Sequence, residues 1–405
     1  MKTKTTRELE TSSEICLIDR TVQKLDFSRL FFENMKLSRF AILLFLGALI
    51  LVSVNSAKAA TEWNPKRTWV FFVGLVQWKD SESFEPFDEK IRKDGILLNS
   101  LRKRGVPEDH IVYLKDSAAT TAVVETRFAD FLKRAAPDDW ILVYFEGHGY
   151  KTDADVPYLA TYDVDDRVLG WKFDAVPNTI ERYFKGSNAI IALDSCYSGA
   201  MANSVKKAKR RVSYAVFASS MASQESTGNW TFTEALISGF NGEPWADYNH
   251  DGKVTLAEMG DNASQDMLFG EEQVSTIAFT GGFDPQTVIA TAAPAASPRV
   301  GDRVEAYTED DWYRGYIADV KSGKFKIHYY GYEPTDDEWL TSKMIRTPSV
   351  GSVYKIGDRV EVEWKKKWYP AHVLNLKGGS HLISYDDYDS DENEWVSTKR
   401  IRKIK

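Results

Sequence analysis

A cysteine and a histidine each follow a short apolar segment of this 405-residue chain. Cys196 comes shortly after the apolar run at 190–193, and His148 follows the run at 143–145. Continuous apolar runs predict buried parallel strands, and open α/β sheets carry their chemistry just beyond the carboxyl ends of such strands. An imidazole that accepts a proton from a thiol makes the sulfur a good nucleophile at neutral pH. The pair therefore predicts nucleophilic catalysis by cysteine.

The residues beside this pair also suit acyl transfer. Gly147 and Gly149 allow the backbone to turn tightly beside His148. The backbone amides of Gly149 and Cys196 would then form an oxyanion hole for an attacked carbonyl group. The alternative is a buried structural cysteine with an ordinary loop histidine. Because both residues follow similar strands, the sequence favours catalysis.

Apolar and amphipathic segments alternate around the two motifs. The order of strand and helix predicts an α/β domain with a mostly parallel sheet and helices on both faces. Its expected strands lie at 68–74, 111–114, 138–143, 190–194 and 214–220, and its expected helices at 94–104, 122–135 and from 231 onward. A chain with 43% hydrophobic residues can bury such a core and still supply smaller domains.

Together with the His-Gly and Asp-x-Cys-x-Ser-Gly signatures, these segments resemble the caspase and metacaspase clan of cysteine peptidases over about 67–290. The resemblance implies a caspase-like fold and an endopeptidase acting on a peptide or protein. Cys196 would attack the peptide carbonyl, His148 would protonate the leaving amine, and Gly149 would help to hold the oxyanion. The alternative from another class is a catalytically silent scaffold that binds partners, but the intact Cys196 and His148 favour the enzyme.

The same resemblance implies that Asp194 faces the side chain before the cut and selects Arg or Lys. Asp163 or Asp165 would add negative charge to the same substrate pocket. The alternatives are a turn or cap role for Asp194 and a solvated acidic loop for the other two. Tyr197 departs from the metacaspase pattern, in which histidine follows the nucleophile. A peptidase with a different substrate specificity therefore remains an alternative.

A dense basic run at 206–211 falls in a predicted loop. Members of the clan are often cleaved in this region during activation, so a basic-specific enzyme would process itself here. The alternative is a solvated charge cluster. The candidate positions are Lys206, Lys207, Lys209, Arg210 and Arg211.

Residues 247–258 follow the pattern of an EF-hand calcium loop. Oxygen ligands fall at positions one, three, five, nine and twelve, and Gly252 supplies the sharp turn at position six. The pattern predicts a Ca²⁺ ion with a structural or activating role, and the alternative is an acidic turn without metal. The expected ligands are Asp247, Asn249, Asp251, the carbonyl of Lys253, Thr255 and Glu258.

The segment 35–59 has the features of a secretory signal. Basic residues precede an apolar run at 40–54, and Ala57-Lys-Ala59 forms a plausible cleavage site. A start at Met35 would leave 1–34 as an untranslated upstream extension. Cleavage would export the protein to the periplasm or the medium, whereas an uncleaved signal would anchor it in a membrane. The net charge of −7 gives no sign of general affinity for nucleic acid.

Beyond a linker of small residues and proline at 291–298, the segments 299–348 and 355–405 repeat each other. Their short alternating strands predict two small all-β barrels of SH3 or Tudor type. They resemble Tudor-like domains of the Tudor-knot and chromo-barrel group, which implies an aromatic cage that binds a methylated ammonium group or a peptide. The ligand would be a partner protein or a surface polymer, and the alternative is that the aromatic residues only fill the barrel cores. The candidates are Tyr313, Tyr329, Tyr332 and Trp339 in the first repeat, and Tyr369, Tyr385, Tyr388 and Trp395 in the second.

Overall fold

The computed structural model describes residues 62–405 except 207–209, 272, 294–297, 309–310, 331, 333, 349–353, 378–379, 398–399 and 405. The predicted upstream extension and signal segment therefore lie outside the described residues. Within the described part, the helices are all too short or too polar to cross a membrane.

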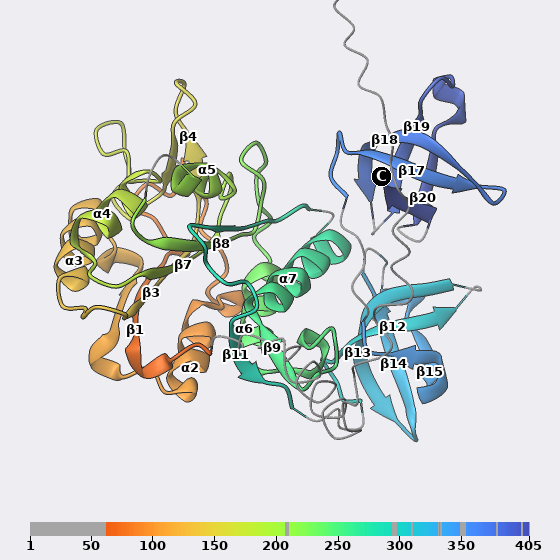
Figure 1. The fold of residues 1–405 in the computed structure, drawn as a ribbon, viewed down its shortest axis with the longest axis horizontal. Coiled ribbons are helices and arrows are strands. Elements are labelled where there is room, and N and C mark those ends of the chain that lie inside the picture. The colour runs from red at the N-terminus through yellow and green to blue at the C-terminus, as the bar shows by residue number, and fades with distance from the viewer. Residues whose placement is uncertain are drawn as a thin grey trace, which may run out of the picture. The chain divides into compact units, whose positions relative to one another are not determined.

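A mostly parallel sheet forms the centre of the first domain (Figure 1). Neighbouring strands are parallel except for β10, which is antiparallel to β8. The side chains of β1 and β3 are buried along their whole length, which explains why these strands read as continuous apolar runs. The predicted sheet is thus confirmed. In spatial order its described strands are β10 (Thr276–Thr280), β8 (Ser213–Ala218), β7 (Asn188–Asp194), β3 (Trp140–Glu146), β1 (Thr68–Gly74) and β2 (Ile111–Lys115).

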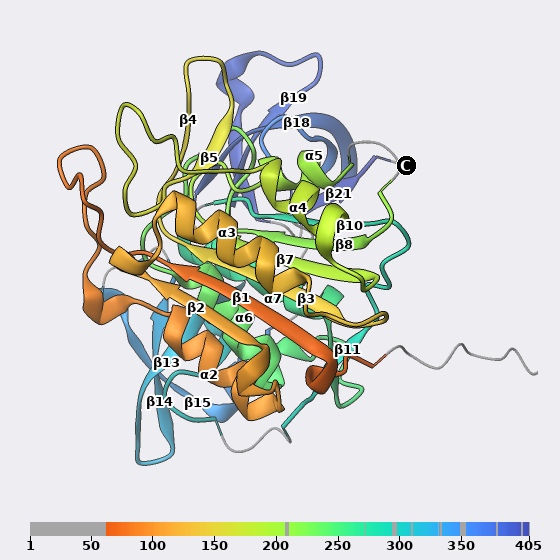
Figure 2. The ribbon, with the colours of Figure 1, turned by 90° about the vertical axis from the view of Figure 1, so that its left-hand side faces the viewer.

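Helices cover both faces of this sheet, as the sequence predicts (Figure 2). One face packs against α3 (Thr121–Leu132), α4 (Ala175–Tyr183) and α5 (Ala200–Lys206). The opposite face packs against α2 (Asp94–Arg104), α6 (Thr231–Asn241) and α7 (Leu256–Glu271). Because successive side chains of a strand alternate between faces, each strand contributes to both cores.

Two small sheets complete the domain. An antiparallel sheet of β4 (Gly149–Lys151), β5 (Pro157–Leu159) and β6 (Trp171–Lys172) begins directly after His148. The second sheet pairs β9 (Lys253–Thr255) with β11 (Val288–Thr291).

Backbone hydrogen bonds extend the α/β domain beyond the predicted range of 67–290. The amide of Trp63 donates to the carbonyl oxygen of Val288 at 2.9 Å, and that of Ala293 donates to Gly242 at 2.8 Å. The domain therefore includes residues 62–293, and the first part of the predicted linker belongs to it.

The C-terminal repeats fold as two antiparallel barrels with the same strand order. Each strand of the second barrel begins 56 residues after its counterpart, and both barrels have a bulge at the same place in their long second strand. The prediction of two small all-β domains is confirmed. The first barrel contains β12 (Arg303–Thr308), β13 (Asp311–Lys321), β14 (Lys324–Tyr329), β15 (Glu338–Thr341) and β16 (Ile345–Arg346), and the second β17 (Arg359–Trp364), β18 (Lys367–Lys377), β19 (Ser380–Tyr385), β20 (Glu394–Ser397) and β21 (Ile401–Lys403).

Candidate active site

The structure places His148 and Cys196 beyond the carboxyl ends of adjacent strands. Glu146 at the end of β3 pairs in register with Asp194 at the end of β7, and each candidate lies two residues further on. The two segments then approach closely, because a Cβ atom added to Gly149 would lie 2.3 Å from the carbonyl oxygen of Cys196. Only glycine fits here without a shift of the backbone.

A backbone carbonyl fixes the hydrogen-bonding role of His148. Its Nε2 atom lies 2.8 Å from the carbonyl oxygen of Glu85. A carbonyl oxygen only accepts, so Nε2 must carry a proton, and the neutral ring keeps Nδ1 as its free acceptor. Burial lowers the pKa of His148, which favours this neutral form at pH 7. The ring can therefore act as a general base through Nδ1.

Three aromatic side chains surround the imidazole. The ring centroids of Trp78, Phe84 and Phe87 lie 4.5, 5.7 and 4.6 Å from that of His148. These residues and the carbonyl of Glu85 come from the loop after β1, where the sequence analysis found no functional residue. Packing of this kind limits rotation of the imidazole.

Cys196 is half-buried and has polar backbone neighbours. The amide of Ser226 donates a hydrogen bond to its sulfur at 3.3 Å. Burial raises the pKa of the thiol, and hydrogen bonds from the amides of Ser226 and Gly149 partly oppose this effect. The resting group is thus a neutral thiol that needs a base during attack. The amide of Gly149 thus approaches the sulfur, and its place in an oxyanion hole stays a prediction.

Asp194 lies in the protein interior, with 1% of its surface exposed. Its Oδ2 atom accepts hydrogen bonds from the hydroxyl of Thr233 at 2.7 Å and from the amide of Thr233 at 3.2 Å. Burial raises the pKa of Asp194 to about 6, and the bonds from Thr233 oppose the shift. The carboxylate is therefore held against the first turn of α6, and its selection of basic substrates stays a prediction.

The other two acidic candidates have local structural roles. Asp163 accepts a hydrogen bond from the amide of Thr121 at 2.7 Å, at the start of α3. Asp165 accepts from the amides of Arg167 and Val168 and closes an exposed turn. These bonds involve the Oδ1 atom of each carboxylate, and the place of both residues in a substrate pocket stays a prediction.

The basic run after α5 is only partly described. Lys207 and Lys209 lie outside the described residues, and Lys206 ends α5. Arg210 donates to the carbonyl oxygen of Ser204 at 2.8 Å, and Arg211 to that of Gly186 at 2.8 Å. The two arginines thus fasten the end of this segment to the domain, and processing within it stays a prediction.

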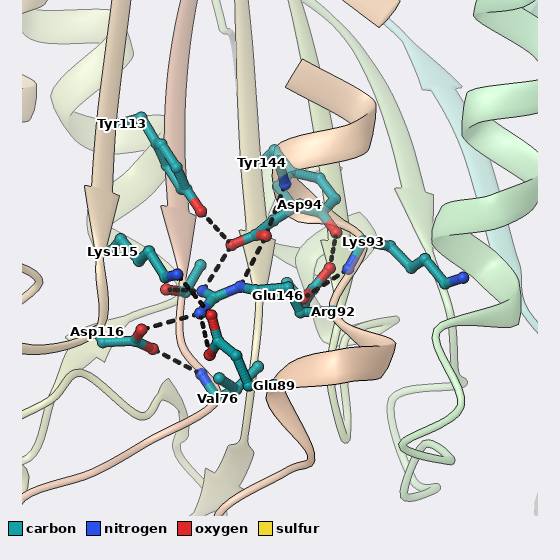
Figure 3. A network of polar contacts seen from close by, with 12 residues as sticks. Val76, Glu89, Arg92, Lys93, Asp94, Tyr113, Lys115, Asp116, Tyr144 and Glu146 are labelled. Atoms are coloured by element: carbon teal, nitrogen blue, oxygen red, sulfur yellow. Dashed lines mark hydrogen bonds and ion pairs between the residues drawn. The ribbon is translucent and has the colours of Figure 1, made fainter. Parts of the chain in front are cut away.

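A buried ion-pair network lies under the same edge of the sheet (Figure 3). Arg92 contacts both carboxylate oxygens of Asp94, at 3.0 and 2.9 Å, and it also contacts Asp116 at 2.9 Å. Asp94 has no exposed surface. Asp116 in turn accepts from the amide of Val76 at 2.9 Å, which fastens the loop that leads to the aromatic residues around His148.

The residues of the predicted calcium loop adopt a compact turn before α7. Asp247 accepts from the amides of Asp251 and Gly252 at 3.2 and 2.9 Å, and Gly252 has a φ of 82°. Glu258 accepts from the amide and the hydroxyl of Thr255, both at 2.9 Å. The residue types are the hard oxygen donors that Ca²⁺ prefers. Among the described residues, however, no group of three or more acidic, histidine or cysteine side chains is placed to hold a metal ion, and Ca²⁺ binding by this loop stays a prediction.

Each barrel has an aromatic pocket, and the largest difference between the two linings is a tryptophan that only the second pocket has. Three tyrosines meet edge to face in each barrel, with centroids 6.0–6.3 Å apart. The second pocket also contains Trp364, whose ring lies 6.1 Å from that of Tyr369, whereas Thr308 has the equivalent place in the first. The pockets measure about 320 Å³ in the first barrel and 270 Å³ in the second.

Trp339 does not line the first pocket, contrary to its assignment to the cage. Glu338 lines the pocket and Leu340 is buried in the barrel core. Because strand residues alternate between faces, Trp339 lies on the other face of β15, where 39% of it is exposed. The side chain of its counterpart, Trp395, lies outside the described residues. Trp364 was not among the predicted cage residues, because the two repeats have different residues at this position.

Residues 357–405 match the family model of the Agenet domain. This match confirms the Tudor-like character of the second repeat. The whole sequence matches no protein with a curated description. Among solved structures, a protein from Geobacter sulfurreducens is similar to the chain, with a TM-score of 0.39 and 14% sequence identity, covering 56% of this chain and 97% of that one.

Proposed function

We propose that the α/β domain is a cysteine endopeptidase. The observation that carries this proposal is the placement of His148 and Cys196 at paired strand ends, with the imidazole oriented by the carbonyl of Glu85. A scaffold without activity has no need of a histidine held as a neutral base at the same sheet edge as a cysteine. The alternatives are such a scaffold and a peptidase that does not select basic residues.

The proposed reaction begins when the sulfur of Cys196 attacks the peptide carbonyl carbon and its proton passes to Nδ1 of His148. The amides of Gly149 and Cys196 stabilise the oxyanion. His148 then returns the proton to the leaving amine, and a thioester remains on Cys196. Water hydrolyses the thioester with the same histidine as base, which restores the thiol.

Matched peptides test the activity and its specificity. Four peptides that differ only in Arg, Lys, Asp or Ala before the scissile bond are incubated with the full chain. We expect cleavage after Arg or Lys, because the buried negative charge of Asp194, two residues before Cys196, attracts a cation. Cleavage of only the Asp or the Ala peptide would show a peptidase with a different specificity. Cleavage of none of the four peptides would favour the scaffold without activity.

We further propose that the loop at 247–258 binds a structural Ca²⁺ ion. The ion would be held by Asp247, Asn249, Asp251, Thr255, Glu258 and the carbonyl of Lys253, and its chemistry would be to neutralise the clustered carboxylates. Binding to the folded state alone raises stability, by about 2.7 kcal/mol at a concentration 100 times the dissociation constant.

Thermal unfolding tests the calcium loop without any assay of activity. We expect Ca²⁺ to raise the melting temperature of the wild type, and Glu258→Gln to remove most of this increase because it loses the bidentate ligand. Glu125→Gln removes the same charge from an exposed position on α3 and serves as the control. Equal melting temperatures with and without millimolar Ca²⁺ would contradict the proposal.

The second barrel supports a binding function with a cationic ligand. Trp364 and three tyrosines line its pocket together with Glu392 and Glu394. Glu394 pairs with Arg400 at 2.7 Å, so Glu392 is the carboxylate that would meet a cation beside the aromatic faces. We propose that this pocket binds a methylated or unmodified basic side chain of a protein ligand. The first pocket, with Thr308 in place of the tryptophan, is expected to bind more weakly.

Calorimetric titration with peptides tests this difference between the pockets. Three peptides carry trimethyl-lysine, lysine or the neutral norleucine at one position. We expect Trp364→Ala to weaken binding of the cationic peptides about tenfold, which corresponds to 1.4 kcal/mol. Thr308→Ala is the matched control in the first barrel and should change little. Equal affinity for the norleucine peptide would contradict a cation-binding pocket.

A further inference from the structure

Two buried carboxyl groups end the neighbouring strands that carry the candidate active site. Glu146 and Asp194 are paired in register between β3 and β7 and are 0% and 1% exposed. Like charges at paired positions of neighbouring strands repel, and the interior offers no water to stabilise them. The surrounding groups must therefore determine which of the two carboxyls is ionised.

Two hydroxyl groups connect these carboxyls. The hydroxyl of Tyr144 lies 2.7 Å from Oε2 of Glu146 and 2.7 Å from Oγ1 of Thr233, and the same Oγ1 lies 2.7 Å from Oδ2 of Asp194. The relay thus has three hydrogen-bond links, and each link needs one proton. The two hydroxyls supply only two protons. The third proton must come from one of the carboxyls.

The environment places that proton on Glu146. Asp194 accepts an additional bond from the amide of Thr233 in the first turn of α6, where the helix dipole stabilises an anion. Glu146 instead faces the carboxylates of Asp94 and Asp194, and burial together with these charges raises its pKa well above the ordinary value. Of the other charged groups, Arg92 pairs with Asp94, and Glu271 acts on Asp194 from the end of α7.

We propose that Glu146 carries the third proton and that the relay through Tyr144 and Thr233 holds Asp194 as an anion. Glu146 donates to Tyr144, Tyr144 donates to Thr233, and Thr233 donates to Asp194. The other oxygen of Glu146 remains free to accept the amide of Lys93 at 3.4 Å. Glu146 is thus a positioning residue that sets the charge of the carboxylate two residues before Cys196. This inference does not depend on peptidase activity.

Infrared spectroscopy of the full chain, labelled with ¹³C-carboxyl glutamate, tests the proposal directly. The label separates glutamic from aspartic carboxyl bands without any substitution. We expect a protonated glutamic acid band that persists above pH 7 in the wild type. The band should disappear in Glu146→Gln and remain in Tyr113→Phe, because Tyr113 bonds to Asp94 at 2.8 Å and lies outside the relay. A wild-type spectrum without a protonated glutamic acid at pH 7 would overturn the proposal.

The pH dependence of unfolding provides a second measurement. The folded protein keeps a proton that an unfolded glutamic acid releases above its ordinary pKa of 4.5. The free energy of unfolding therefore falls as the pH rises from that value toward the raised pKa of Glu146. Glu146→Gln should reduce this dependence by one proton, whereas Glu125→Gln, which removes an exposed glutamate on α3, should leave it unchanged. If Glu146→Gln leaves the pH dependence of the free energy of unfolding unchanged, the additional proton of the folded protein is not on Glu146.

Discussion

Replacement of Cys196 by alanine is expected to abolish peptide cleavage, with a loss of roughly 10⁴-fold or more in kcat. Without the sulfur no thioester forms, and the oxyanion hole alone supports little hydrolysis. His148→Ala should cause a similar loss, because the thiol of Cys196 has a raised pKa and is mostly protonated at neutral pH. Rates of cleavage of the Arg peptide by the purified variants measure both effects.

Two controls separate this result from misfolding. Cys196→Ala should keep the melting temperature of the wild type within a few degrees, because Cys196 is only half-buried and alanine is close to it in size. Tyr197→Phe removes an adjacent hydroxyl that bonds to Glu225 at 3.2 Å and should retain most of the activity. If the folded Cys196→Ala variant keeps full activity, Cys196 is not the nucleophile.

Arg92→Met is expected to lower the free energy of unfolding by about 3–5 kcal/mol. The substitution leaves the carboxylate of Asp94 fully buried without the guanidinium that contacts both of its oxygens. It also releases Asp116, which fastens the loop after β1. Denaturant unfolding of the α/β domain, followed by the fluorescence of its buried tryptophans, measures the loss.

An exposed ion pair provides the matched control for this substitution. Arg102 contacts Glu108 at 2.8 Å, but the side chain of Glu108 is 72% exposed. Arg102→Met removes the same type of group and should cost at most about 1 kcal/mol. Equal losses in the two variants would show that the Arg92 network contributes no more than a surface pair.

The parts of the fold that the sequence predicted are those with a periodic or continuous apolar pattern. The central strands are buried on both faces, so their runs stand out, and parallel pairing then places His148 and Cys196 at the same edge. The two barrels were predictable because the repeat shows the same turns and strands twice. In both cases local residue patterns reflect burial in the folded protein.

Contacts between distant segments left no such pattern. Glu85 orients His148 through its backbone carbonyl, which every residue possesses, and Arg92 meets Asp116, 24 residues further along the chain, only after the chain has folded. The relay from Glu146 to Asp194 passes through Thr233, which is 39 residues beyond Asp194 in the chain. Trp364 could not be predicted from the repeat, because the first barrel has Thr308 at the equivalent position.

The most direct test of the central claim is to trap the acyl group on the enzyme. The full chain is mixed with a peptide ester that carries arginine at its acyl end, quenched in acid and digested for mass spectrometry. We expect the peptidyl group as a thioester on Cys196 in the wild type and its absence in His148→Ala. Product formation with the acyl group on another residue, or a folded, calcium-loaded protein that is never acylated, would contradict the account.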